Sequence, residues 1–104
     1  MNEIERIVQL PVRLNYSLSG TLKDMLNVAL AQARLQYEVD GMVKAIGDGF
    51  QRWRNMLQGM EVDRDLAISA YVRTLAVAIP DLFVVAWERG AFRDYQLDEN
   101  EQKV

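Results

Sequence analysis

Apolar side chains at helical spacing dominate residues 22–57, and this periodicity constrains the fold more than any other feature of the sequence. One run of apolar residues recurs every three or four positions from Leu22 to Tyr37, and a second overlaps it from Leu35 to Leu57. Such spacing gathers apolar side chains on one face of an α-helix. The members of the second run are Leu35, Val39, Met42, Ile46, Phe50, Trp53 and Leu57.

The two runs occupy different faces, because at about 100° per residue their centres lie more than a quarter-turn apart. A break at Asp40-Gly41 coincides with this change of face, whereas the second run keeps its phase through Gly47-Asp48-Gly49. We therefore predict helices over about 21–39 and 42–58, the first capped by Thr21. One continuous, kinked helix over 21–58 is the alternative.

Two further helices are predicted in the second half of the chain. Asp63 is a good N-cap for a helix that continues to Ile79 and is apolar on nearly every side, which indicates a buried central element. Pro80 ends that helix and is suited to begin another, over 81–89, with Gly90 after its end. The β-branched and aromatic residues of 82–87 leave a strand as the alternative there.

The first twenty residues have a different pattern. Apolar and polar residues alternate from Val8 to Leu18, which is typical of a half-buried strand, and Pro11 would confine such a strand to a sheet edge. A rival interpretation takes Ile4, Ile7 and Val8 as one turn of a short helix that Pro11 stops. Both can hold, in which case a helical start precedes an extended arm.

These segments predict an all-α fold, a compact bundle of three to four helices with an extended N-terminal arm or short strand. We expect one domain over 1–104, in which 1–20 form the arm and 92–104 a frayed acidic tail. The net charge is −3, and 92–104 hold two basic against four acidic side chains. The rest of the chain is nearly neutral and has no broad electrostatic attraction to nucleic acid or anionic lipid.

The composition excludes several chemistries. The chain has no cysteine and no histidine, so it cannot form a disulfide, a thiolate nucleophile or a catalytic triad from its own residues. Asp63-Arg64-Asp65 is read as a helix N-cap and first turn, and 38–50 matches neither a calcium loop nor a phosphate-binding loop. We predict no enzyme activity, no cofactor and no metal site.

The most apolar stretch, 66–87, is long enough to cross a bilayer. It contains Arg73, Pro80 and Asp81, and a charge near the bilayer centre costs about 3 kcal/mol. We therefore predict no membrane association and a cytoplasmic protein.

The apolar surface exceeds what one small core needs, which predicts contact with a protein partner or a second copy. We expect a small non-catalytic interaction protein, acting as an adaptor, an inhibitor or an assembly subunit. The candidate partner-binding residues are the second apolar run together with Trp87, Arg89 and Phe92. For Trp87 and Phe92 the alternative is that they close the core.

A nucleic-acid-binding regulator is the alternative function. Arg52 and Arg54 flank Trp53, and basic side chains beside an aromatic ring are typical of nucleic-acid binders. Arg64 is the third candidate residue. On a helix, however, Arg52 and Arg54 lie about 200° apart, and the chain is acidic overall.

Overall fold

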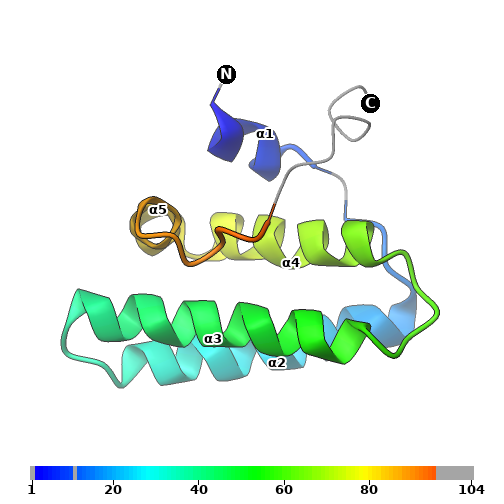
Figure 1. Cartoon of the computed structure of the whole chain (residues 1–104), viewed down its shortest axis with the longest axis horizontal. Coiled ribbons are helices and arrows are strands. Elements are labelled where there is room, and N and C mark those ends of the chain that lie inside the picture. Colours follow the sequence, from blue (N-terminus) through cyan, green and yellow to red (C-terminus); the bar gives the residue numbers. More distant parts are fainter. Residues whose placement is uncertain (1, 11, 96–104) are drawn as a thin grey trace.

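The computed structural model describes residues 2–10 and 12–95, and within these ranges every regular element is an α-helix. The five helices are α1 (Glu3–Val8), α2 (Tyr16–Arg34), α3 (Val39–Leu57), α4 (Arg64–Ala78) and α5 (Pro80–Glu88). The helices α2 and α3 lie side by side, α4 lies between this pair and α1, and α5 is viewed nearly end-on (Figure 1). The predicted all-α bundle is confirmed, with five helices in the described residues rather than three or four.

The central position predicted for α4 is also confirmed, because α4 contacts all four other helices. It begins where expected, since the Asp63 side chain accepts a hydrogen bond of 3.2 Å from the Leu66 backbone N–H. The buried surface of α4 combines small residues, such as Ala67 and Ala70, with the larger Tyr71 and Leu75. Helices therefore approach α4 closely on more than one side.

An aromatic cluster fills the space between α3, α4 and α5. The Trp53 ring of α3 stacks on the Tyr71 ring of α4 at 5.5 Å between centroids, and its indole N–H donates to the Ala67 carbonyl at 3.0 Å. Phe92 lies 5.2 Å from the Phe50 ring and 5.1 Å from the Phe83 ring. These contacts join residues more than forty positions apart into one core.

Among the described residues of 1–20, the predicted extended arm or short strand is wrong, because α1 and the start of α2 occupy most of this segment, and the rival short helix is confirmed. The first helix, α1, ends at Val8, ahead of Pro11, and the Asn2 side chain caps its start. The next helix already begins at Tyr16, because the Asn15 side chain accepts a hydrogen bond of 2.7 Å from the Leu18 N–H. Thr21 is therefore an interior residue of α2 and not its N-cap.

The helices α2 and α3 are separate, so the continuous helix over 21–58 is excluded. A helix of that length would extend about 57 Å at 1.5 Å per residue, whereas the longest dimension of the molecule is 38 Å. The break lies at 35–38 and not at Asp40-Gly41, which belong to the first turn of α3. Asp40 suits that position, because a negative charge near a helix N-terminus is favourable.

The C-terminal helix, α5, lies within one residue of the predicted 81–89 at each end, and the alternative strand over 82–87 is wrong. Pro80 is its first residue, where a missing backbone N–H costs nothing. Gly90 has a φ of 81°, a left-handed conformation that favours glycine, and it reverses the chain after α5. Residues 92–95 then fold onto the core through the buried Phe92 and Tyr95, so they are not frayed. The rest of the predicted tail, 96–104, lies outside the described residues.

Gly49 allows α2 and α3 to cross closely. A β-carbon at this position would lie 2.7 Å from the Ala29 β-carbon and 3.0 Å from the Tyr71 hydroxyl oxygen. Real β-carbons essentially never approach to 2.7 Å, and the second contact is also tight, so the crossing of α2 and α3 favours glycine here. By contrast, a β-carbon built on Gly20 would have no atom within 4 Å beyond its chain neighbours and the backbone of its own helix, because Gly20 is on the exposed side of α2.

We expect Gly49→Ala to lower the free energy of unfolding by about 1–3 kcal/mol, because the added methyl group overpacks the crossing. Alanine otherwise favours a helix by about 1 kcal/mol, so the control Gly20→Ala is expected to raise stability. Urea denaturation of both variants measures the difference. Equal stabilisation by the two substitutions would contradict the close crossing.

Candidate functional site

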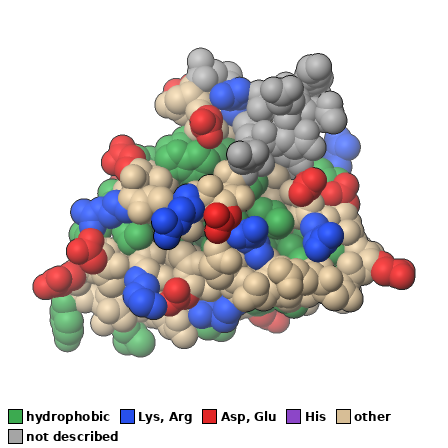
Figure 2. Space-filling view, in the orientation of Figure 1, with side chains coloured by type: hydrophobic (Ala, Val, Ile, Leu, Met, Phe, Trp, Pro, Cys, Tyr) green, Lys and Arg blue, Asp and Glu red, His purple; other side chains and the backbone are tan. Residues whose placement is uncertain are grey.

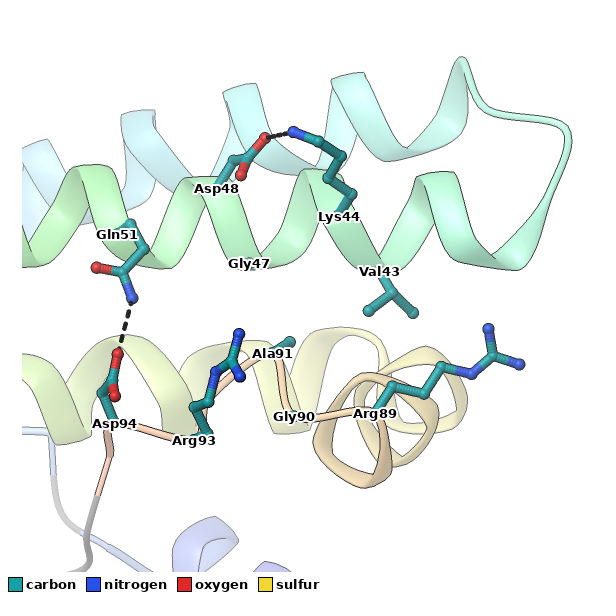
Figure 3. Close-up of a pocket in the computed structure, with 10 residues that line it drawn as sticks. All are labelled: Val43, Lys44, Gly47, Asp48, Gln51, Arg89, Gly90, Ala91, Arg93 and Asp94. Atoms are coloured by element: carbon teal, nitrogen blue, oxygen red, sulfur yellow. Dashed lines mark hydrogen bonds and ion pairs between the residues drawn. The ribbon is translucent and has the colours of Figure 1, made fainter.

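A pocket of about 280 Å³ lies between α3 and the turn that follows α5. Side chains and backbone from both elements line it, as Figure 3 shows. On the α3 side the lining residues are Val43, Lys44, Gly47, Asp48 and Gln51, and on the other side they are Arg89, Gly90, Ala91, Arg93 and Asp94. We call it the Arg93 pocket.

The turn after α5 positions the charged side chains of this pocket. The backbone reverses at Gly90, and the Ala91 N–H donates to the Ala86 carbonyl at 3.0 Å. Phe92 then enters the core, which leaves its neighbour Arg93 on the outside. In Figure 3 the Arg93 side chain points from the turn toward α3, beside Ala91.

Most of the charges around the pocket are compensated within the chain. Lys44 pairs with Asp48 at 2.7 Å, Arg89 pairs with Asp40, and Asp94 pairs with Arg54 at 3.4 Å. The Gln51 amide also donates to Asp94 at 3.5 Å. Within residues 2–10 and 12–95, Arg93 has no ion pair or side-chain hydrogen bond, so it is the uncompensated charge of the pocket.

Three apolar side chains are exposed in the connection between α2 and α3 and at the first residue of α3. The exposed fraction is 76% for Leu35, 101% for Tyr37 and 43% for Val39. We call residues 35–39 the apolar turn. Glu38 stands between Tyr37 and Val39 in the sequence, and it has neither a capping hydrogen bond nor an ion pair among the described residues.

The apolar turn and the Arg93 pocket lie at the same end of the molecule. The Asp40–Arg89 ion pair joins the start of α3 to the end of α5, and Val43 and Lys44 of the pocket follow one helical turn after Val39 and Asp40. In Figure 2, hydrophobic side chains protrude at the lower left, where Figure 1 shows the α2–α3 connection. Charges of both signs are interspersed over the face above them (Figure 2).

The predicted partner-binding residues divide between surface and core. Leu35 and Val39 are exposed in the apolar turn, and Arg89 lines the pocket. Met42 and Trp87 are half-buried. The structure places the others inside the chain's own core: Ile46, Phe50, Trp53, Leu57 and Phe92. The inner part of the second apolar run, from Ile46 to Leu57, is therefore buried against α4 and the C-terminal turn, and only its first members reach the surface.

The three candidate nucleic-acid-binding arginines do not form one patch. Arg52 borders the groove between α2 and α3, beside Asp24. Arg54 lies on the other side of α3, with its guanidinium 5.6 Å from the centre of the Phe50 ring and paired with Asp94. Arg64 is the first residue of α4. The arrangement therefore offers no continuous basic surface built from these three residues.

The Tyr71 hydroxyl is a buried polar group without a hydrogen-bond partner among the described residues. Burial raises the pKa of Tyr71 to about 12, and the nearby Arg52 partly opposes this effect. The hydroxyl is thus protonated at neutral pH and is not a base. In the described part of the chain, no three carboxylate, histidine or cysteine side chains gather where they could hold a metal ion.

Tyr37, Glu38 and Arg93 are the site residues that the sequence did not indicate. Tyr37 fits the spacing of the first apolar run, so the sequence assigned it to a buried helix face. The connection 35–38 contains no glycine or proline, the residues that usually mark a helix break. Arg93 differs from its neighbours only in the folded chain, where Lys44, Arg89 and Asp94 each form an ion pair and Arg93 forms none with the described residues.

No protein-family model, curated protein or solved structure matches the chain. Of the helices in residues 2–10 and 12–95, none is both long and apolar enough to cross a membrane.

The raised pKa of Tyr71 predicts a loss of stability at high pH. The unfolded chain releases the phenolic proton near pH 10 and the folded chain near pH 12, so the free energy of unfolding falls as pH rises between these values. Tyr71→Phe removes this contribution, and at neutral pH it costs no hydrogen bond. We expect the variant to lose less stability than the wild type between pH 9 and pH 12 in urea denaturation.

Tyr16→Phe is the matched control, because the Tyr16 side chain is 95% exposed. Its stability is expected to follow the wild-type pH dependence. If Tyr71→Phe also follows the wild type, the phenol is not shielded from solvent as described.

Proposed function

We propose that the protein is a small non-catalytic interaction protein of the cytoplasm, an adaptor, inhibitor or assembly subunit, that self-associates through the apolar turn. The observation that carries this proposal is the exposure of Leu35, Tyr37 and Val39 within five consecutive residues. Isolated apolar residues on a surface are ordinary, whereas adjacent ones indicate a contact site.

The chemistry of the apolar turn suits protein contact. Tyrosine is enriched at binding hot spots, because its ring buries a large area and its hydroxyl retains a polar function. Covering Leu35 and Tyr37 would remove apolar surface from water, the main favourable contribution to association. Lys44 lines a shallow hollow together with Leu35, and Arg89 pairs with Asp40, the residue after the turn, so both can supply the polar rim that interfaces commonly have.

A second copy is the partner that we propose. The turn is short, and interfaces that bury less than about 1,200 Å² are typically weak. We therefore expect a dimer that dissociates on dilution, with a dissociation constant weaker than about 1 μM.

Sedimentation velocity over about a hundredfold range of protein concentration tests the proposal, because a weak dimer dissociates across such a range. We expect the wild type to shift from monomer to dimer. Replacing Leu35, Tyr37 and Val39 by glutamine is expected to leave a folded monomer at every concentration, since these side chains are exposed.

Val28→Gln combined with Val77→Gln is the matched control. These valines are 51% and 53% exposed on α2 and α4, outside the apolar turn. The control is expected to dimerise like the wild type. A monomeric wild type, or a triple variant that dimerises as well as the wild type, would contradict the proposal.

A further inference from the structure

We propose that Glu38 of one protomer binds Arg93 of its partner, so that each protomer inserts its apolar turn beside the Arg93 pocket of the other. This inference rests on the self-association proposed above. It names the two residues that would fix how the protomers are aligned. It also names the group that the pocket would bind, a single carboxylate.

The Arg93 pocket suits one carboxylate, because it holds one positively charged side chain without an ion pair among the described residues. Its other charges are paired within the chain, through Lys44–Asp48, Arg89–Asp40 and Asp94–Arg54. The remaining guanidinium, on Arg93, points toward α3 across the pocket (Figure 3). A guanidinium binds a carboxylate through two parallel hydrogen bonds, which gives direction as well as attraction.

The apolar turn carries a matching carboxylate. In the sequence, Glu38 stands between the exposed Tyr37 and Val39, and it is itself exposed. The neighbouring acid of the turn region, Asp40, is already paired with Arg89. Docking of the apolar turn would bring Glu38 to Arg93 of the other protomer and would cover apolar surface at the same time. Because water would be excluded, the Glu38–Arg93 ion pair would be stronger.

The positions of the apolar turn and the Arg93 pocket permit a dimer in which each protomer binds the other in the same way. The turn and the pocket lie at the same end of one molecule, joined by the Asp40–Arg89 ion pair. A twofold axis near this end would place the turn of each protomer at the pocket of the other, and twofold dimers are the commonest closed assemblies. Two Glu38–Arg93 contacts would then form in each dimer.

Exchange of the two charges tests the inference. In Glu38→Arg two arginines would face each other, and in Arg93→Glu two glutamates would do so. Either variant alone is expected to dimerise at least about tenfold more weakly than the wild type. An equimolar mixture of the two is expected to form a heterodimer, because both contacts between unlike protomers then join opposite charges.

The double variant, with both residues exchanged, is expected to dimerise like the wild type. Glu61→Arg is the control, because this exposed acid lies after α3, at the helix end opposite the apolar turn, and it should leave dimerisation unchanged. Circular dichroism verifies that each variant is folded, and sedimentation velocity measures association.

The outcomes separate the two proposals. If the wild type dimerises and the single variants do so equally well, the Glu38–Arg93 contact is wrong while self-association stands. Failure of the mixture to form a heterodimer, when each single variant is monomeric, also overturns the contact. A wild type that remains monomeric at every concentration overturns both.

Discussion

The structure depends on Trp53, whose ring and indole N–H together fix α3 against α4. The ring stacks on Tyr71, and the N–H reaches the Ala67 carbonyl at 3.0 Å. Because α4 contacts every other helix, this junction positions the whole bundle. It also accounts for the close crossing at Gly49, where the Tyr71 hydroxyl would meet any β-carbon. The core is thus closed within the chain, and the exposed apolar surface of functional interest lies outside it.

Local signals predicted the second half of the fold well. Asp63, Pro80 and Gly90 each fix a helix boundary through their own backbone or side-chain chemistry, and all three lie where the structure uses them. The first half was harder, because Asn15 and Thr21 are both acceptable caps. The apolar series extends back to Leu18, which is buried in the first turn of α2, and this favours the earlier start.

The candidate site could be predicted only in part. Leu35, Val39 and Arg89 were indicated as contact residues, and all three lie at one end of the molecule. The inner part of the same apolar run is covered by α4, which periodicity along one helix cannot reveal. The Asp40–Arg89 and Arg54–Asp94 pairs join distant positions, so only the folded chain distinguishes Arg93 from its paired neighbours Arg54 and Arg89.

The central claim is that the apolar turn of one copy contacts the Arg93 pocket of another. Isotope-filtered NMR on a mixture of labelled and unlabelled protein tests it most directly, because it detects contacts between copies alone. The account predicts cross-peaks from the Tyr37 ring protons to the methyl groups of Val43 and Ala91 in the partner, both of which line the pocket. Intermolecular cross-peaks that involve only residues away from the turn, or none at concentrations where the protein is dimeric, would contradict it.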